Sequence, residues 1–461
     1  MSASPVIARL RQRLGEEAVR NDIAERVAYS YDNSRMQALP EAVVFAHGHD
    51  DVVTVAHACR ETGTPLVARG RGTNTTGASV PTEGGIVLSL EGMQRILDYR
   101  PADRLLVCEA GTLNDAVQAR AASDGLFWAP DPTSTGYSTV GGNIACGAGG
   151  PRAVKYGTSR EAVLGLRAVD GRGETLVCGC RTSKGVVGYD LTRLLIGSEG
   201  TLAIVTEATL RLLPRATARR EMRAAFRDVD TAAAAVARIM GQAVIPCALE
   251  LMDEQCVALA RAHADLELPA ATGALLLLSA DGHEATIAQD VAAIARAAEG
   301  EGLLEWRAAA GDTDAASVWA ARKALSPALR SLAPKKINED VAVPVSRLGE
   351  LLAGLRELSA RHGLRIVNFG HAGNGNIHVN ILADPEDPAQ MAAIDACLDA
   401  VFSLVLELGG TLSGEHGVGV AKRDFVAREI EATTLARMRD IKRLFDPDGI
   451  LNPGKTLPAG P

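Results

Sequence analysis

Short apolar runs separated by glycine and proline characterise the chain from Val43 to about Leu213. The segments PLVARG, IVLSL and LLVCEAG are apolar or β-branched and are bounded by turn residues, which predicts a strand in each. VLGLRAVDGRGETLVCG predicts a β-hairpin around Asp170-Gly171. GTLAIVTEATLRLLP predicts two further strands that end at Pro214. This part of the chain is therefore expected to be rich in strands.

The pattern changes after residue 214, where alanine-rich helical segments follow. We expect helices in DVDTAAAAVARIMGQ, CALELMDEQCVALARAH, HEATIAQDVAAIARAAEGEG, ASVWAARKALSPALRSLA, VSRLGELLAGLRELSARHG and AQMAAIDACLDAVFSLVLELGG. GALLLLSADG is predicted to be a buried strand, and MSASPVIARLRQRLGEEAVR an amphipathic helix. These shifts divide the chain into residues 1–213, 214–409 and 410–461.

The segment NFGHAGNGNIHVN, residues 368–380, holds two of the nine histidines. Asn374-Gly375 between extended runs predicts a two-residue type I′ hairpin turn. That turn would pair His371 with His378 and place their Cβ atoms roughly 5 Å apart on one face. The two imidazoles could then hold one metal ion, or they could be an ordinary pair of hydrogen-bonded histidines.

Composition narrows the class of protein. A chain of 461 residues is too long for one ordinary core, so two or three domains are expected. A net charge of −8 without a basic cluster argues against nucleic acid as a partner. No apolar run approaches about 20 residues and no signal peptide is evident, so we expect no transmembrane segment. The eight cysteines form no C-x-x-C motif and no iron–sulfur ligand run, which favours the cytoplasm, either free or peripherally at the inner membrane.

A glycine-rich loop, ARGRGTNTTGAS, follows the strand PLVARG. Consecutive backbone N–H groups without bulky side chains can bind an anion such as a pyrophosphate. Gly70, Gly72 and Gly77 do not follow the Rossmann spacing, and Ala78 stands where a P-loop has lysine. Alone, this loop fits a plain tight turn equally well.

Residues 131–169 favour a bound cofactor. The segment contains eight glycines and many small residues, with apolar residues interleaved. A segment so poor in side-chain volume leaves space against its backbone that a large planar cofactor can fill. A floppy surface loop is the alternative, and the interleaved apolar residues argue against it.

Together with these glycine segments, four further motifs occur in order: GYDLTRLLIGSEGTLAIVTE, GHAGNGNIHVN, SGEHGVG and FDPDGILNPGK. Over roughly residues 31–455 the chain resembles the FAD-linked D-2-hydroxyacid dehydrogenases. This branch of the vanillyl-alcohol-oxidase-type flavoproteins includes cytochrome-type D-lactate dehydrogenase, D-2-hydroxyglutarate dehydrogenase and the catalytic subunit of glycolate oxidase. The resemblance implies an α+β fold of the p-cresol methylhydroxylase (PCMH) type. It comprises an FAD-binding domain of two α+β subdomains, an α+β substrate (cap) domain and a helical C-terminal segment.

The resemblance also implies how FAD is bound. Relatives with covalent flavin carry histidine where Thr73 stands, so FAD is expected to be non-covalent. Arg71, Asn74 and Ala78 replace glycines of the family's usual loop. The implied FAD contacts are Arg69, Gly70, Arg71, Gly72, Thr73, Asn74, Pro132, Thr133, Gly141, Gly142, Asn143, Gly157, Glu199, Gly200, Ile204 and Asn452.

By the same resemblance, His371, His378 and Glu415 ligate a divalent metal. Two histidines, one glutamate and open positions are typical of catalytic zinc, and Mn²⁺ and Fe²⁺ accept the same ligands. Asn374 replaces the family's aspartate in the turn of the motif. Oxidation of an α-hydroxy acid removes the hydroxyl proton and passes the Cα hydride to flavin, and a Lewis acid on the hydroxyl oxygen assists the proton's departure.

The remaining implied residues act on the substrate. His416 matches the family's general base, with a metal-orienting role as its alternative. Arg322 and Lys336 match positions that bind the substrate carboxylate, for which a bidentate arginine is suited. Lys335 is the alternative to Lys336, and a solvated helix face is the alternative role for Arg322. Asn380, on the histidine face of the hairpin, would hydrogen-bond the substrate.

The implied activity is oxidation of a small D-2-hydroxy acid of the D-lactate type to its 2-oxo acid. D-2-hydroxyglutarate and glycolate are alternative substrates. The electrons would leave to an acceptor protein or a quinone, because the chain has neither an iron–sulfur nor a nicotinamide motif. A metal hydrolase and a non-catalytic flavin-binding subunit of a larger oxidase are the other classes left open. A homodimer is compatible with the sequence and is not required by it.

Overall fold

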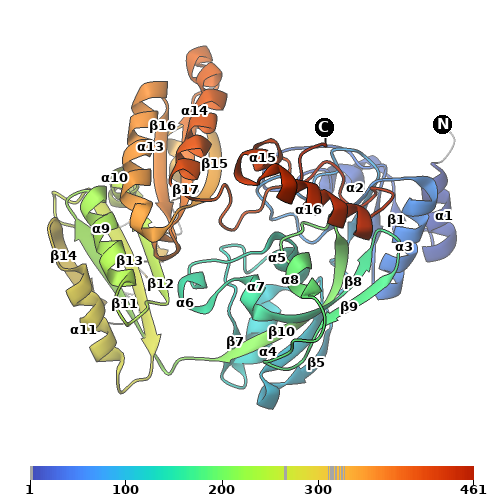
Figure 1. Cartoon of the computed structure of the whole chain (residues 1–461), viewed down its shortest axis with the longest axis horizontal. Helices are drawn as coiled ribbons and strands as arrows, with labels where there is room; N and C mark the ends of the chain where they lie inside the picture. The colour runs from blue at the N-terminus through green and yellow to red at the C-terminus, as the bar shows by residue number, and fades with distance from the viewer. Residues whose placement is uncertain are drawn as a thin grey trace. The chain divides into compact units, whose positions relative to one another are not determined.

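The computed structural model describes residues 4–263, 267–309, 311, 316, 319–320, 322, 325 and 328–460. Its internal contacts define two compact units, which contain distant parts of the sequence (Figure 1). Unit 1 comprises Met1–Gly150, Gly157–Arg215 and Glu415–Pro461, and unit 2 comprises Pro151–Tyr156 and Ala216–Gly414. The short segment 151–156 thus leaves the glycine-rich stretch of unit 1 and packs in unit 2.

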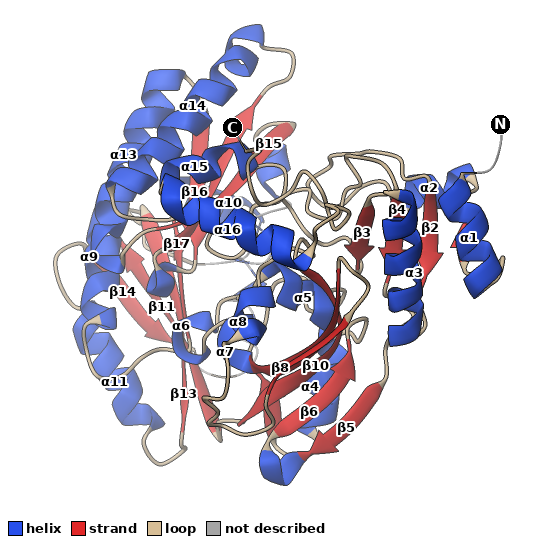
Figure 2. Cartoon of the chain, turned by 45° about the vertical axis from the view of Figure 1, so that its right-hand side comes forward, coloured by secondary structure: helices blue, strands red, loops and turns tan. Residues whose placement is uncertain are grey.

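The first sheet of unit 1 has the strand order β1-β2-β4-β3. Its parallel strands β2, β4 and β3 confirm the strands predicted in PLVARG and IVLSL. Helix α3 connects β2 to β3 and ends at Gly63, whose left-handed conformation (φ 64°) caps the helix (Figure 2). The elements are α1 (Pro5–Leu14), β1 (Val19–Arg20), α2 (Ile23–Ala28), β2 (Ala42–Phe45), α3 (His49–Thr62), β3 (Leu66–Arg69) and β4 (Ile86–Ser89).

The second sheet of unit 1 has the order β5-β6-β10-β8-β9, with β7 also paired to β10. The β8–β9 hairpin around Asp170-Gly171 is confirmed. The two strands expected in GTLAIVTEATLRLLP are wrong, because β10 runs unbroken through this segment. Register shifts within its pairing to β8 bend it instead of ending it. The strands are β5 (Ile96–Arg100), β6 (Leu105–Glu109), β7 (Leu126–Trp128), β8 (Val163–Asp170), β9 (Thr175–Gly179) and β10 (Ala203–Pro214).

Short helices link the strands of unit 1, and the chain returns to this unit after residue 414 with a longer helix. Leu451, near the C-terminus, forms a parallel bridge with Leu66 of β3, so the last segment is built into the first sheet's edge. These helices are η1 (Pro101–Asp103), α4 (Asn114–Ala122), α5 (Val140–Cys146), α7 (Ser159–Ala162), α8 (Leu191–Leu195), η5 (Arg423–Phe425), α15 (Val426–Glu429) and α16 (Ala432–Phe445).

Unit 2 is built on one seven-stranded antiparallel sheet of order β14-β11-β13-β12-β16-β17-β15. The inner strand β13 confirms the buried strand predicted in GALLLLSADG. The strands are β11 (Ala218–Phe226), β12 (Ala248–Met252), β13 (Ala274–Gly282), β14 (Leu303–Ala308), β15 (Lys335–Ala342), β16 (Arg365–Gly370) and β17 (Asn376–Ala383).

Helices α9, α11, α13 and α14 contact one another and form a layer on this sheet (Figure 1). Helix α10 packs against the face that carries Met252 and Phe369. The single helix predicted for CALELMDEQCVALARAH is wrong. Its first part is the buried strand β12, and α10 begins only at Glu254. The helices are α6 (Ala153–Tyr156), α9 (Val229–Met240), α10 (Glu254–His263), α11 (Ile287–Ala298), η2 (Leu329–Ser331), η3 (Val345–Arg347), α13 (Leu348–His362), η4 (Ala372–Asn374) and α14 (Pro388–Glu407).

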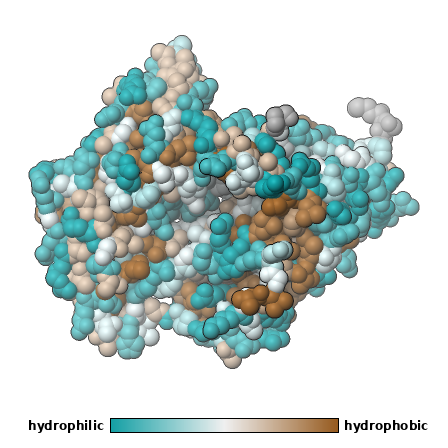
Figure 3. All heavy atoms as spheres, in the orientation of Figure 1, coloured by the Kyte–Doolittle hydropathy of each residue, from teal (hydrophilic) through white to brown (hydrophobic). Residues whose placement is uncertain are grey.

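Helix α14 is the one described helix whose length and mean hydropathy (1.6) would let it cross a membrane, a test that core helices of other proteins also pass. It contacts α13 and β17 within unit 2. Its exposed positions include Asp395 and Asp399, and the surface in this region mixes hydrophilic and hydrophobic residues (Figure 3). The predicted helix ASVWAARKALSPALRSLA lies largely outside the described residues.

Candidate functional site

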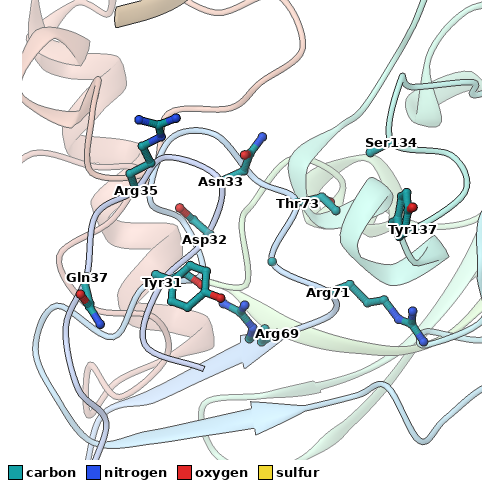
Figure 4. A pocket seen from close by; sticks show the side chains of 11 residues that line it. Tyr31, Asp32, Asn33, Arg35, Gln37, Arg69, Arg71, Thr73, Ser134 and Tyr137 are labelled. Carbon is teal, nitrogen blue, oxygen red and sulfur yellow. The ribbon is translucent and has the colours of Figure 1, made fainter. Parts of the chain in front are cut away.

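A cavity of about 610 Å³ opens in unit 1 beside the glycine-rich loop (Figure 4). Three segments surround it: the loop that carries Tyr31, the loop after β3, and the turn that carries Tyr137. The lining residues are Tyr31, Asp32, Asn33, Arg35, Gln37, Arg69, Arg71, Gly72, Thr73, Ser134 and Tyr137. Four of the expected FAD contacts therefore line one cavity, together with Ser134, which follows Thr133 directly.

The turn after β3 needs glycine. Gly72 adopts φ 62°, and a Cβ atom there would lie 2.1 Å from Arg69 Nη2. Arg69 is buried, and its Nη1 donates to the Tyr31 carbonyl over 2.6 Å, while its Nε has no hydrogen-bond partner. Gly70 is also tightly placed, because a Cβ atom there would lie 2.4 Å from Thr139 Oγ1. The loop backbone therefore passes close to its neighbours without side chains between them.

Helix α5 carries the predicted contacts Gly141, Gly142 and Asn143. The Gly141 N–H donates to the Ala110 carbonyl over 2.8 Å, and a Cβ atom at residue 141 would lie 2.6 Å from Ala110 Cβ. Thr139 caps the helix by accepting a hydrogen bond from the Gly142 N–H. Asn143 is buried, and its Nδ2 has no partner. The start of α5 is thus fixed directly on the backbone that follows β6.

Glu199 and Asn452 are both buried and both adopt left-handed backbone conformations, with φ of 52° and 40°. Asn452 Nδ2 donates to the carbonyls of Glu199 (2.6 Å) and Ala78 (2.9 Å), while its Oδ1 has no partner. The Glu199 carboxylate accepts the N–H groups of Val418 and Gly419, each at 2.8 Å. Burial raises the pKa of Glu199, and these hydrogen bonds oppose that shift.

The segment Glu415-His416 is held by two glycine-rich motifs of unit 1. The Gly150 N–H donates to Glu415 Oε2 over 2.7 Å, and Asn74 Nδ2 donates to the His416 carbonyl over 3.1 Å. Glu199 restrains the chain two residues later, as described above. The sequence had suggested FAD contacts for Asn74 and Glu199, and the structure adds that both hold the backbone next to His416.

Unit 1 is suited to hold FAD. Three of the expected contacts, Arg69, Asn143 and Asn452, are buried, and each has a polar atom without a hydrogen-bond partner among the described residues. The cavity beside Gly72 offers space next to backbone N–H groups that a pyrophosphate can accept from. Of the other expected contacts, Gly157 and Gly200 adopt left-handed conformations with φ of 78° and 72°, and Ile204 is buried on β10.

The histidine hairpin of unit 2 differs from its predicted register. His378 pairs with Phe369 instead of His371, because residues 371–375 form a longer connection that contains η4 and the left-handed Gly375 (φ 67°). The two histidines are nevertheless adjacent, with ring centroids 5.1 Å apart and an edge-to-face geometry. Both rings are buried, and their separation allows them to share one metal ion.

Strand alternation places the substrate-binding candidates on the same sheet face as His378. Asn380 shares this face as residue i+2 on β17, and Lys336 pairs with Leu382 in the same register. Lys335 points to the opposite face, so the strand register favours Lys336. Asn380 Nδ2 donates to the carbonyls of Val367 and His378, and its buried Oδ1 has no hydrogen-bond partner in the part of the chain that the structure describes.

His371 and Arg322 share one acid, Glu250, which lies in the middle of β12. His371 Nδ1 and Glu250 Oε1 form a short hydrogen bond, and Arg322 Nε donates to Glu250 Oε2 over 2.7 Å. The Arg322 guanidinium lies 4.4 Å from the centre of the Phe369 ring. Burial alone would raise the pKa of Glu250, but its hydrogen-bonded partners His371 and Arg322 outweigh burial and lower the pKa to about 2. Arg322 is therefore an ion-paired side chain and not part of a solvated helix face.

A second buried acid, Asp340, lies beside the other histidine. Its Oδ1 is 3.9 Å from His378 Nδ1 and accepts a hydrogen bond from Asn376 Nδ2 over 2.6 Å. The Asp340 carbonyl accepts the Gly414 N–H over 3.3 Å. Glu415 is the next residue in the chain, so its Cα atom lies about 3.8 Å from that of Gly414. Glu415, the predicted third metal ligand, thus directly follows Gly414, which is hydrogen-bonded to Asp340.

Comparison with known proteins identifies the family. Residues 215–456 match the family described as FAD linked oxidases, C-terminal domain, and residues 40–179 match the FAD binding domain. The chain belongs to the FAD-linked oxidase family. It is 35% identical to glycolate oxidase subunit GlcD of Bacillus subtilis, over 99% of this chain and 97% of that protein. It is 33% identical to a D-lactate dehydrogenase of Anaerostipes hadrus (91% and 90%) and to a D-2-hydroxyglutarate dehydrogenase of Xanthomonas citri pv. viticola (98% and 96%).

Solved structures show the fold of this FAD-linked oxidoreductase. The chain superposes on p-cresol methylhydroxylase with a TM-score of 0.80 at 17% identity, over 98% of this chain and 96% of that one. The predicted family and the predicted PCMH-type α+β fold are therefore confirmed, and so is the FAD cofactor. The metal-hydrolase alternative does not account for the FAD-binding domain at residues 40–179.

Sequence reasoning missed Glu250 and Asp340. Glu250 was hidden because its segment was assigned to a helix, where a single glutamate on a solvated face attracts no attention. Within the strand ALELM it is the one charged residue of a fully buried run, and such a residue is retained only with strong partners. Asp340 carries no such signal, because its strand KKINEDVA holds four charged residues, of which Glu339 and Asp340 are buried.

A buried lysine in the C-terminal motif NPGK predicts a pH-dependent stability. Burial lowers the pKa of Lys455 from 10.5 to about 8, while its Nζ donates to Thr82 Oγ1 over 2.8 Å. The folded protein then binds fewer protons than the unfolded chain between about pH 8 and pH 10.5, so wild-type stability should rise with pH in that window. Across this window the free energy of unfolding of the wild type should rise by about 3 kcal/mol at most relative to that of Lys455→Met. Urea unfolding of both proteins across this window measures it, and parallel curves would contradict it.

Proposed function

We propose that this FAD-linked oxidoreductase is a divalent-metal-dependent dehydrogenase that oxidises a small D-2-hydroxy acid to its 2-oxo acid. The observation that carries the proposal is the cluster on one sheet face of unit 2: His371 and His378 are adjacent, Arg322 and His371 share one acid, and the buried Asn380 lies two residues from His378 on β17. A D-lactate-type acid is the first candidate. Glycolate and D-2-hydroxyglutarate are alternatives, because relatives at similar identity carry those names.

The side chains of unit 2 suit the recognition of a hydroxy acid. Arg322 Nε is bonded to Glu250, and neither of its terminal nitrogens is hydrogen-bonded to the described part of the chain, so both can receive a carboxylate. Lys336 adds positive charge on the same face. Asn380 Oδ1 is a buried acceptor with no partner and can take a hydrogen bond from the substrate hydroxyl. His371 and His378, with Glu415, would hold the metal.

Two cofactors complete the chemistry when bound: FAD takes up the two electrons of the oxidation, and the metal polarises the substrate hydroxyl. His416 is the proposed general base that accepts the hydroxyl proton. Its backbone is fixed by Asn74 and, through the following residues, by Glu199, so its position is set by the flavin-binding unit. We further propose an acceptor protein or a quinone as the electron acceptor, with the enzyme in the cytoplasm or at the inner membrane.

An anaerobic titration tests the proposal. The FAD- and zinc-loaded protein is mixed separately with D-lactate, L-lactate, glycolate and D-2-hydroxyglutarate while the oxidised-flavin absorbance is followed. We expect bleaching by one of the three proposed acids, no bleaching by L-lactate, and loss of bleaching after chelation. A yellow protein that none of these acids bleaches would contradict the proposal and favour a non-catalytic flavin subunit.

Arg322→Met tests the carboxylate clamp. A hydrogen-bonded pair to a charged group contributes about 1.5–3 kcal/mol, so kcat/KM for the preferred acid should fall by roughly 10- to 150-fold. Most of the loss should appear in KM, because the carboxylate is bound in ground state and transition state alike. Arg220→Met, an exposed arginine of the same unit that pairs with Glu284, is the matched control and should leave kcat/KM unchanged. An unchanged KM in Arg322→Met would exclude this residue from substrate binding.

A further inference from the structure

Glu250 is an unexpected residue for its position. It lies at the centre of β12 between two other strands, and its exposed fraction is 0%. The adjacent core on this face consists of apolar side chains such as Met252, Leu275 and Leu277. A buried carboxylate is costly unless every oxygen is paired. Each Glu250 oxygen does have its own partner, His371 for one and Arg322 for the other.

We propose that Glu250 is a positioning residue that orients the metal-ligating His371 and the substrate-binding Arg322 through one carboxylate. The inference rests on the proposed function, because it assigns Glu250 to the metal and substrate groups named there. It adds a residue that touches neither substrate nor metal but fixes two groups that do.

The chemistry of the imidazole explains the first half of this role. A carboxylate accepts a hydrogen bond, so a neutral His371 carries its proton on Nδ1. In that tautomer the lone pair is on Nε2, which is the nitrogen that would ligate a metal ion. Histidine ligands of metal ions commonly have such a carboxylate partner, which fixes the tautomer and the ring orientation. The same contact raises the basicity of Nε2 and so strengthens His371 as a metal ligand.

The geometry of the guanidinium explains the second half. Glu250 binds Arg322 through Nε, which leaves the two terminal nitrogens on the far side of the planar group. Phe369, 4.4 Å from the guanidinium carbon, restrains the same plane from one face. Phe369 in turn packs against the His378 ring, with centroids 5.6 Å apart. One acid and one aromatic ring therefore link the arginine to both histidines.

Asp340 does not occupy an equivalent position. Its Oδ1 lies 3.9 Å from His378 Nδ1, beyond hydrogen-bond distance, and its oxygens accept from Asn376 Nδ2 and Ser413 Oγ. Asp340 thus restrains the hairpin turn and the segment that leads to Glu415. Glu250, by contrast, is in direct hydrogen-bond contact with the metal-ligand candidate His371.

The test compares Glu250→Gln with Glu221→Gln. Glutamine replaces one carboxylate oxygen by an NH2 donor, so in this position it cannot accept from both His371 and Arg322 through separate oxygens. Glu221 is a matched control, since it is a buried acid of the same sheet that pairs with Arg219 and Trp319 but with no histidine. Zinc affinity is measured on FAD-loaded, metal-free protein by competition with a chromogenic chelator, with flavin content, thermal unfolding, kcat and KM as further readouts.

We expect Glu250→Gln to bind zinc about 10- to 100-fold more weakly while keeping its flavin, and to raise KM for the preferred hydroxy acid. Glu221→Gln should lose a similar amount of stability and retain wild-type zinc affinity. Wild-type zinc affinity in Glu250→Gln would overturn the inference and leave the proposed function intact. If the wild-type protein binds no divalent metal, the inference and the metal-dependent function fail together.

A second variant covers the case in which Glu250→Gln does not fold. Glu250→Asp keeps the negative charge but is shorter by one methylene, so it can reach only one of its two partners. We expect it to fold and to show either weakened zinc affinity or a raised KM. Wild-type values for both quantities would overturn the inference.

Discussion

His378→Ala should abolish nearly all hydroxy-acid oxidation while leaving the protein yellow. Its ring lies on the β16–β17 hairpin of unit 2, edge-to-face with His371, and it is one of the two proposed imidazole ligands of the metal. A metal ion that polarises the hydroxyl group contributes several kcal/mol, so kcat/KM should fall by roughly 10³-fold or more. FAD content should not change, because the expected FAD contacts all belong to unit 1. Steady-state kinetics, zinc content and the flavin absorbance measure the three quantities.

His362→Ala provides the control for this prediction. His362 is the last residue of α13 in the same unit, and its removal should affect neither zinc content nor rate. Chelation of the wild-type protein should reproduce the His378→Ala phenotype, and added zinc should restore only the wild type. If the wild-type protein kept its full rate after chelation, the metal assignment would be falsified.

The candidate site was predictable where its residue types are tied to local motifs. His371 and His378 were expected to be neighbours because Asn374-Gly375 signals a hairpin, and they are neighbours although the register is shifted. The connection is longer than a two-residue turn because η4 inserts a turn of 3₁₀ helix before Gly375. The Asn374-Gly375 pair thus indicated a hairpin, but the length of the connection, which includes η4, decided which residues of β16 and β17 pair.

Two strands, β12 and β10, show where local sequence patterns fail to predict secondary structure. Glu250 and β12 were missed because ALELM followed by DEQCVALARAH has helical periodicity throughout, and only the pairing of β12 with β13 and β16 makes the first part a strand. Likewise β10 was divided in two because polar residues interrupt it. Its neighbours on both sides keep it extended. Non-local pairing, which no short window of sequence contains, decided both cases.

Gly141→Val should produce a protein that has lost its FAD. The Gly141 N–H is bonded to the Ala110 carbonyl, and a Cβ atom would lie 2.6 Å from Ala110 Cβ and 2.9 Å from that carbonyl oxygen. Neither atom belongs to a flexible side chain, so the start of α5 must move, at a cost of about 1–3 kcal/mol. Gly142 and Asn143 would move with it. We expect FAD affinity to fall by roughly 10-fold or more, which corresponds to at least about 1.4 kcal/mol.

The flavin-to-protein absorbance ratio after purification and a titration of the apoprotein with FAD measure this loss. Gly349→Ala is the matched control, since it is also the second residue of a helix but a Cβ atom there meets only Ala233 Cβ at an ordinary 3.8 Å. Alanine should be neutral or slightly stabilising at that position. Normal FAD binding in Gly141→Val would show that the first turn of α5 can shift without disturbing the cofactor. The tight contact with Ala110 would then serve folding alone, and the FAD contacts assigned to Gly141, Gly142 and Asn143 would have to be withdrawn.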